Sequence, residues 1–195
     1  MDWENAYQQK ETPWDKGEPS PGLVDLLALT PMAGRVLVPG CGLGHDVRAI
    51  SALPGTEVIG VDVAPTAVEL ARGFTVVGRE RYALVDLFGL PASYRGAFDW
   101  VWEHTCFCAI PKGRREEYVA AVRASLLEGG RLAAIFYLDP GWDDPEQGPP
   151  FGVSKAELDG FFLGAGRFAL EQEWVPARAY AGREGRELIR VMRAV

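Results

Sequence analysis

The sequence predicts an α/β, Rossmann-like fold: a mostly parallel seven-stranded sheet with an antiparallel C-terminal hairpin and helices on both faces. Short apolar runs of strand length alternate with helix-like segments, which is typical of a parallel sheet covered by helices. The last two apolar runs are joined instead by the short polar segment AGREG, which is typical of an antiparallel hairpin. The length favours a single domain over residues 1–195.

Seven strands are predicted from the apolar runs, at residues 35–38, 57–62, 82–88, 98–104, 131–138, 168–175 and 188–192. Six helices are predicted between and before them, at residues 3–10, 22–28, 46–52, 64–72, 113–130 and 154–166. Three of these helices carry boundary signals. Pro65 and Gly73 flank one, glycines 129 and 130 are expected to cap another, and Ser154 with Glu157 forms a capping-box pattern at the start of the last.

The first 21 residues are rich in tryptophan, proline and charge. Trp3, Tyr7 and Trp14 are costly to leave in water, so we expect this segment to pack on the body of the domain. Trp3 and Tyr7 are four residues apart and share one face of the predicted helix.

Composition restricts the function to a few classes. A net charge of −7 argues against a nucleic acid as the main partner, because such binding neutralises phosphates. No apolar run has the length of a membrane span and the first ten residues do not resemble a signal peptide, so we expect a cytoplasmic protein without a membrane partner. Three cysteines without a CxxC pair and two histidines make a metal site improbable. A small-molecule ligand is favoured.

The stretch VLVPGCGLGHDV, residues 36–47, predicts a binding loop at the end of a strand. Glycine adopts positive φ and allows a ligand to approach the backbone closely. Asp62 ends the next strand about 20 residues later, where a carboxylate in this architecture accepts hydrogen bonds from ribose hydroxyls. Its position also fits a simple cap on the helix that follows, and both interpretations stay open.

The loop separates two classes of cofactor. A dinucleotide needs the pattern G-x-G-x-x-G with its pyrophosphate at the helix N-terminus, whereas this chain has G-x-G-x-G at Gly40, Gly42 and Gly44. Asp46 follows where a phosphate would need positive potential. S-adenosylmethionine has no phosphate, and its cationic groups tolerate carboxylates, so Asp46 favours this cofactor. Asp86 with Leu87, at the end of the third predicted strand, is a candidate contact for its adenine, although a solvated strand end is equally compatible.

Several longer motifs resemble the class I methyltransferases, and within them the thiopurine methyltransferase-like group, especially its thiol and halide methyltransferases. They are WENAYQQKETPWDKG, VLVPGCGLGHDV, VIGVDVAPTAVELA, VDLF, FDWVWEHTCFCAIP and GPPFGVS, in family order along nearly the whole chain. The glycine loop and Asp62 are generic to methyltransferases, whereas TPWDKG, TCFCAIP and GPPFGVS are much more specific.

The resemblance implies S-adenosylmethionine as the cofactor, with residues 1–21 as a lid over it. By position, the implied cofactor-binding residues are Trp3, Tyr7, Trp14, Gly40, Gly42, Asp62, Val63, Asp86, Leu87 and Glu103. His104 is the clearest departure, because relatives with halide and thiol activity often carry tyrosine there. The change leaves the cofactor prediction untouched and opens the question of the substrate.

The resemblance also implies methyl transfer to a small soft nucleophile: a thiol, bisulfide, a halide or a thiopurine-like sulfur. His104 is the candidate catalytic group, because an imidazole accepts a proton or, when charged, holds an anion, although a structural histidine is the commoner case. His45 is a weaker option. The predicted acceptor pocket is apolar, with candidate residues Phe107, Phe136, Tyr137, Trp142 and Phe151, and Trp14 from the lid. Arg114 or its neighbour Arg115 is a candidate for holding an anionic acceptor, although a solvated surface arginine is the commoner case. Only one of Cys106 and Cys108 is expected to face the site, and neither as a nucleophile.

Two alternatives stay open: a methyltransferase for an oxygen, nitrogen or metalloid acceptor, and a catalytically idle module that binds the cofactor. A dehydrogenase is a third alternative, after these two. The expected assembly is a monomer or weak dimer.

Overall fold

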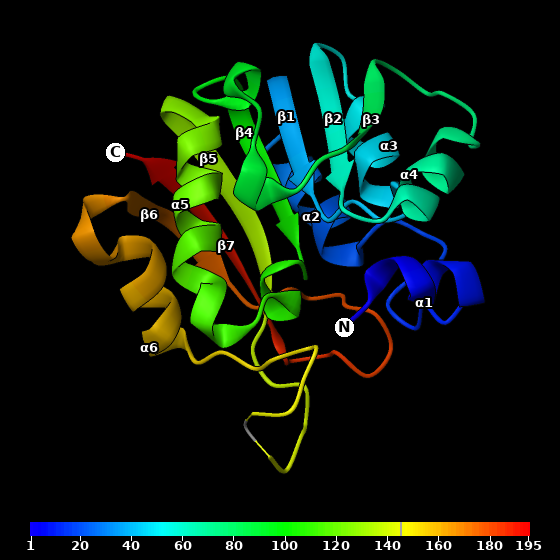
Figure 1. Ribbon diagram of the computed structural model, residues 1–195. Helices are drawn as coiled ribbons and strands as arrows, with labels where there is room; N and C mark the ends of the chain where they lie inside the picture. Colours follow the sequence, from blue (N-terminus) through cyan, green and yellow to red (C-terminus); the bar gives the residue numbers. More distant parts are fainter. Residues whose placement is uncertain (145) are drawn as a thin grey trace.

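A seven-stranded sheet forms the centre of the computed structural model, which describes residues 1–144 and 146–195 (Figure 1). The strand order is β3-β2-β1-β4-β5-β7-β6, with β7 antiparallel to both β5 and β6 and the other neighbours parallel. The strands are β1 Gly34–Pro39, β2 Thr56–Asp62, β3 Glu80–Leu84, β4 Phe98–His104, β5 Leu126–Tyr137, β6 Phe168–Trp174 and β7 Glu187–Ala194. The predicted fold class is confirmed.

Helices cover both faces of this sheet (Figure 1). The α-helices are α1 Trp3–Gln9, α2 Pro21–Leu29, α3 His45–Ser51, α4 Pro65–Arg72, α5 Arg115–Ser125 and α6 Lys155–Leu158. Residues of α5 and α6 pack on one face in a cluster with Leu37, whereas residues of α2 and α3 pack on the other face with Val36 and Val38. This alternation along β1 is the two-residue period of a strand buried on both sides.

Two predicted elements, the helix over residues 113–130 and the third strand, end earlier in the structure. The helix predicted to reach residue 130 ends at Ser125, because Leu126 is buried and already pairs with Phe98 as the first residue of β5. Gly129, expected in a helix cap, has a φ of 74° inside that strand, where the pairing register shifts. The third strand ends at Leu84 rather than residue 88, because Asp86 accepts a hydrogen bond from the backbone N–H of Phe88 and starts a turn.

The predicted capping box at Ser154 and Glu157 is present and starts α6. The helix that it starts is short in its α-form, since the chain continues as a π-helix at Asp159–Leu163 and a 3-10 turn at Gly164–Gly166. None of the helices in the described ranges is long and apolar enough to cross a membrane.

Candidate functional site

A pocket with a volume of about 620 Å³ opens at the carboxyl ends of the parallel strands. Ligands of open α/β sheets bind at this edge. The wall is built from the glycine loop, the ends of β2, β4 and β5, the N-terminal segment, and the loops that follow β5 and β6. Its volume is in the range of small-molecule sites.

The glycine loop lines the pocket with backbone. Gly40 and Gly42 have φ angles of 59° and 51°, a conformation that favours glycine. A Cβ on Gly40 would lie 2.8 Å from Sγ of Cys106, and one on Gly42 would lie 2.8 Å from the hydroxyl oxygen of Tyr7. Both positions therefore require glycine for two reasons, conformation and close approach.

Asp62 connects the glycine loop to α4. One carboxylate oxygen accepts from the backbone N–H of Gly42 at 2.9 Å, and the other accepts from that of Ala64 at 3.0 Å. Burial raises the pKa of Asp62, and these N–H groups offset the rise only in part. The helix-cap interpretation is thus realised, yet Asp62 also lines the pocket, and each oxygen retains a lone pair for a further donor.

Val63, Asp86 and Leu87 continue the wall on the same side. Val63 is 48% exposed, whereas Leu87 is buried. Asp86 accepts from the N–H of Phe88 at 2.9 Å, which fixes its carboxylate at the rim. An apolar surface beside a fixed carboxylate fits a flat, amine-bearing ring.

Aromatic rings of the N-terminal segment form another part of the wall. The ring centroids of Trp3 and Tyr7 lie 5.2 and 5.8 Å from that of Trp14, both edge to face, and Nε1 of Trp14 donates to the Tyr7 hydroxyl at 3.1 Å. Burial raises the pKa of Tyr7, so its hydroxyl stays protonated. The three rings pack against Ala64 and Ala67 of α4.

Acidic side chains of this segment make polar contacts with the body. Glu4 accepts from the backbone N–H and the hydroxyl of Thr66, at 3.0 and 2.6 Å. Asp15 contacts Nε2 of His45 at 3.1 Å, and Nδ1 of His45 lies 2.9 Å from a guanidinium nitrogen of Arg48. Because arginine only donates, Nδ1 of His45 accepts and its Nε2 carries the proton toward Asp15.

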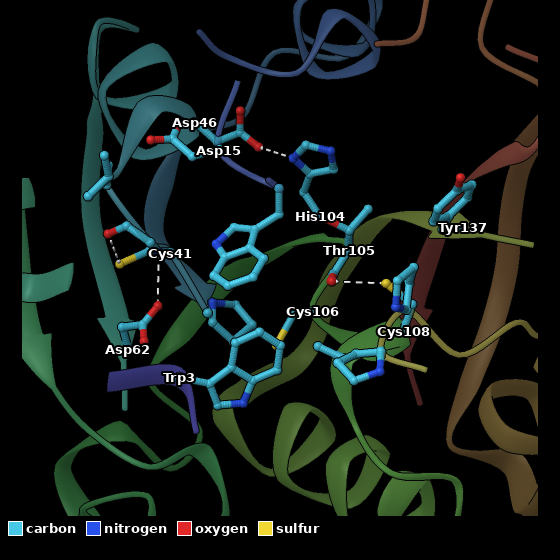
Figure 2. A pocket seen from close by; sticks show the side chains of 18 of the residues that line it. Trp3, Asp15, Cys41, Asp46, Asp62, His104, Thr105, Cys106, Cys108 and Tyr137 are labelled. Carbon is cyan, nitrogen blue, oxygen red and sulfur yellow. Dashed lines mark hydrogen bonds and ion pairs between the residues drawn. The ribbon is translucent and has the colours of Figure 1, made fainter. Parts of the chain in front are cut away.

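His104 ends β4 and lies in the wall beside Asp46 of α3 (Figure 2). Nδ1 of His104 is 2.8 Å from Oδ2 of Asp46. Burial alone would lower the pKa of His104, but the charge and hydrogen bond of Asp46 outweigh it and the pKa is raised. Burial likewise opposes ionisation of Asp46, yet His104 holds its pKa below the usual value. Asp46 is therefore ionised and accepts a hydrogen bond from the imidazole.

Two aromatic rings lie near the imidazole. Its centroid lies 6.2 Å from Trp102 and 5.8 Å from Tyr180. Nε2 of His104 is buried without a hydrogen-bond partner among the described residues. Arg183 lies over the rings of Tyr137 and Tyr180, and a guanidinium nitrogen is 3.4 Å from the carboxylate of Glu187.

Glu103 was predicted to bind the cofactor, and the structure places it beneath the pocket rather than in its wall. It is fully buried, and one oxygen accepts from the backbone N–H groups of Cys106 and Phe107 at 2.7 and 2.8 Å. Burial raises its pKa to about 7. These bonds hold the turn after β4, in which Thr105 adopts a φ of 56°.

All three cysteines line the pocket, including both Cys106 and Cys108. The prediction that only one of the last two faces the site assumed an extended strand and is wrong, because residues Phe107–Ala109 form a 3-10 turn. Sγ of Cys108 donates to the carbonyl of Thr105 at 3.1 Å. Burial raises the pKa of all three thiols, that of Cys108 to about 12, so they stay protonated.

Of the predicted acceptor-pocket residues, Tyr137 and Trp142 lie in the wall. Phe107 lies in the core, as does Phe136, while Arg114 pairs with Glu117 on the surface. Phe151 is outside the wall, and its carbonyl accepts from the buried Arg115.

Sequence reasoning missed the contributions of Tyr180, Arg183 and Thr105, and the contact between Asp46 and His104. Tyr180 and Arg183 lie between the two C-terminal strands, far from any motif. The Asp46 partnership joins residues 58 positions apart. No group of three or more potential metal ligands gathers in the part of the chain that the structure describes.

A family model described as thiopurine S-methyltransferase (TPMT) matches residues 1–174. A probable thiol methyltransferase 2 of Arabidopsis thaliana is 33% identical over 80% of this chain and 69% of its own length. A thiocyanate methyltransferase 1 of Brassica oleracea is 30% identical over 95% and 81%, respectively.

Among solved structures, a Burkholderia thailandensis 1,6-didemethyltoxoflavin N1-methyltransferase, with its substrate and S-adenosylhomocysteine bound, superimposes with a TM-score of 0.77. The match is 21% identical and covers 100% of this chain and 86% of the other. At this identity the likeness shows the shared fold.

Proposed function

This chain belongs to the thiopurine S-methyltransferase family and is an S-adenosylmethionine-dependent methyltransferase, and we propose that it methylates a small soft nucleophile in the pocket described above. The observation that carries the proposal is the composition of that single pocket wall. One side has the glycine loop and Asp62, and the other has His104 with soft and aromatic side chains. A cofactor and a small acceptor therefore have adjacent places.

The side with the glycine loop fits S-adenosylmethionine. Gly40 and Gly42 leave room along the backbone for the methionine part, and Asp62 retains acceptor capacity for ribose hydroxyls. Asp86 with Leu87 suits the adenine, and Val63 lies beside it in the wall. When bound, the cofactor supplies an electrophilic methyl group on a sulfonium.

The N-terminal segment, residues 1–21, acts as the lid in this proposal. Trp3, Tyr7 and Trp14 pack together against α4 and line the pocket. Their role is to exclude water, because a dry site leaves a nucleophile less solvated and strengthens electrostatic interactions. The contacts of Glu4 and Asp15 hold the lid in place.

On the other side, His104 is the proposed catalytic group, and Tyr137 and Trp142 are the proposed acceptor contacts. Holding a nucleophile in line with the methyl group supplies roughly 7–11 kcal/mol of the barrier in well-oriented reactions. A sulfur acceptor fits the protonated thiols of Cys106 and Cys108 and the aromatic rings of this wall. An oxygen, nitrogen or metalloid acceptor is the second candidate, and an idle cofactor-binding module is the third.

The compartment, the oligomeric state and the class of partner are further parts of the proposal. We expect the protein to act in the cytoplasm as a monomer or weak dimer on a small molecule rather than on a nucleic acid or a membrane. The net charge of −7 supports the exclusion of nucleic acids. Size-exclusion chromatography with light scattering tests the assembly.

Isothermal titration with S-adenosylmethionine and S-adenosylhomocysteine, followed by assays with a panel of thiols, bisulfide and iodide, tests the proposal. Binding with methylated product detected by mass spectrometry is the expected result, and the product names the acceptor. Binding without product from any acceptor would leave an idle module, and no binding would remove the cofactor assignment. Glu171→Gln, an exposed ion-pair variant on β6, is the matched control with unchanged binding and turnover.

A further inference from the structure

Asp46 is held in place by three hydrogen bonds, one from the segment before α2 and two from β4. Oδ1 accepts from the backbone N–H of Ser20 at 2.8 Å, and Oδ2 accepts from Nε1 of Trp102 and contacts Nδ1 of His104, each at 2.8 Å. Trp102 is fully buried, and Asp46 exposes 12% of its side chain. The carboxylate therefore has one orientation toward the imidazole.

This contact decides which nitrogen of His104 carries the proton. An ionised carboxylate only accepts, so Nδ1 of the imidazole is protonated and donates to Asp46. In the neutral ring, Nε2 then has a free lone pair. That atom is the buried polar atom of the ring that lacks a partner in the described part of the chain. Such an atom indicates a missing partner that brings a proton.

The second histidine of the chain has no such free position. His45 uses Nδ1 to accept from Arg48 and Nε2 to contact Asp15. Both ring nitrogens are therefore satisfied within the protein. The pair of His45 and Asp15 joins the lid to the body, whereas the pair of His104 and Asp46 leaves one nitrogen for a ligand.

Other charged groups also act on His104. Glu103 precedes it on β4, with its side chain on the opposite face of the sheet, and Glu187 comes from β7. Arg183, from the loop before β7, is positive and pairs with Glu187. The hydroxyl of Tyr180 donates to the carbonyl of Glu18, away from the imidazole. Within the described part of the chain, Asp46 is the carboxylate in contact with the ring, so it has the largest effect on the charge there.

Resting on the function proposed above, we propose that Asp46 is a positioning residue that makes His104 a general base, and that the site therefore takes acceptors that arrive protonated on sulfur or oxygen. Thiols and aromatic hydroxyl compounds are such acceptors, whereas iodide and thiocyanate are anions that need no base. Ser20 belongs to the lid segment, so the lid contributes one of the bonds that orient the base.

The proton and electron balance of the step is simple. The S–H or O–H bond of the acceptor breaks, and its proton goes to Nε2 of His104. The electron pair left on the acceptor forms the new bond to the methyl carbon, while the sulfonium bond to that carbon breaks and leaves neutral S-adenosylhomocysteine. Asp46 stabilises the imidazolium that forms. The proton then leaves to solvent when the product departs.

Nuclear magnetic resonance tests the positioning without turnover. The chain has two histidines, so a sample with ¹³C,¹⁵N-histidine gives two ring systems, which His104→Gln assigns. In Asp46→Asn the amide NH₂ can donate to Nδ1, so we expect the ¹⁵N shifts to show the proton on Nε2 and the pKa of His104 to fall. Asp15→Asn, the matched control, changes the His45 resonances and leaves the tautomer of His104 in place. An unchanged His104 tautomer and titration in Asp46→Asn would overturn the proposal.

Turnover with acceptors of graded acidity tests the chemistry. Asp46→Asn should lower kcat for thiols by about tenfold or more, since general bases contribute roughly 10²–10⁴-fold. The deficit should be largest for the thiol of highest pKa, shrink as pH approaches that pKa, and vanish for iodide. In a His104→Gln background, Asp46→Asn should cause no further loss of kcat.

The outcomes separate this inference from the proposed function. Equal losses for thiols and iodide would make His104 an anion holder, and additive losses in the double variant would make Asp46 merely structural; either outcome rejects the inference and keeps the methyltransferase. A wild-type protein that binds the cofactor and methylates none of the acceptors would reject the proposed function, while the tautomer measurement still decides the role of Asp46. Affinity for S-adenosylmethionine should be equal in the wild type and in the Asp46 and His104 variants.

Discussion

Asp62 and Asp46 reach the pocket from different sides, and their pKa values are shifted in opposite directions (Figure 2). Both are largely buried, and each accepts two hydrogen bonds from neutral N–H groups. Burial raises the pKa of Asp62 above the usual range in spite of its two bonds. Burial acts on Asp46 in the same direction, but His104 reverses the result. Neutral donors only partly offset burial here, whereas a countercharge outweighs it.

The difference corresponds to two uses of a carboxylate. Among the described residues, no cation contacts Asp62, so its free lone pairs suit the neutral hydroxyl donors of a ribose. Asp46 makes its hydrogen bonds within the protein, and in our proposal it acts on the ligand through His104. Under this proposal an aspartate binds the ligand directly on the cofactor side and orients a second side chain on the acceptor side.

Removing His104, the countercharge of Asp46, should abolish the difference in pKa shift between Asp46 and Asp62, and it gives the largest expected effect. In His104→Gln, Asp46 becomes a buried carboxylate with neutral partners, so its pKa should rise as that of Asp62 does. Turnover with a thiol should fall by about 10²–10⁴-fold, the usual contribution of a general base. Carboxyl ¹³C titration and steady-state kinetics measure the two effects. Undiminished turnover between pH 6 and 9 would contradict the base role.

Sequence patterns predicted the residues that line the glycine-loop side of the pocket better than those that line the His104 side, for a physical reason. The glycine loop and Asp62 are adjacent strand ends, so parallel pairing of β1 and β2 brings them together from local information alone. Asp46 and His104 meet only because α3 packs over β4, a contact between residues 58 positions apart. Asp46 was interpreted by its charge, and no local signal indicates its partner.

The alternation of β4 explains the placement of Glu103. Trp102 and His104 point to the face covered by α3, where both contact Asp46. Glu103 lies between them in sequence and therefore points to the opposite face. Side chains alternate between the two faces along the predicted strand over residues 98–104. This alternation alone places Glu103 and His104 on opposite faces of the sheet.

Glu103 provides a third carboxylate with neutral donors and sharpens the comparison. Its pKa of about 7 in the folded protein, against 4.5 as the ordinary value, means that the folded state binds a proton that the unfolded state has released between these pH values. Stability should therefore fall as pH rises through this window, by about 3 kcal/mol in total.

Glu103→Gln keeps an oxygen for the N–H groups of Cys106 and Phe107 and cannot ionise. The variant should lose the dependence of unfolding free energy on pH between about 4.5 and 7 that Glu103 causes. Urea unfolding at several pH values measures it, with Glu171→Gln as the control. Equal slopes in the wild type and Glu103→Gln would show that Glu103 titrates normally.

Asp62→Asn tests the direct use of a carboxylate. The amide retains one acceptor for the glycine loop and loses the charge-assisted bonds expected to the ribose, which are worth about 1.5–3 kcal/mol each. The binding free energy of S-adenosylmethionine should weaken by roughly the contribution of one such bond, while kcat at saturating cofactor changes little. Isothermal titration measures the affinity, and an unchanged value would remove Asp62 from the cofactor site.

Asp15→Asn should give the smallest effect, because its partner His45 is satisfied on the other side by Arg48 and both side chains are partly exposed. Partly exposed ion pairs contribute about 0–1 kcal/mol. The change should appear as a slightly weaker affinity for S-adenosylmethionine, since the contact holds the lid, and as no change in the pH dependence of kcat. Asp46→Asn should do the reverse, with affinity retained and the pH dependence altered. Equal behaviour of the two variants would mean that both histidine–aspartate pairs serve the lid, and the contrast between orientation and attachment would fail.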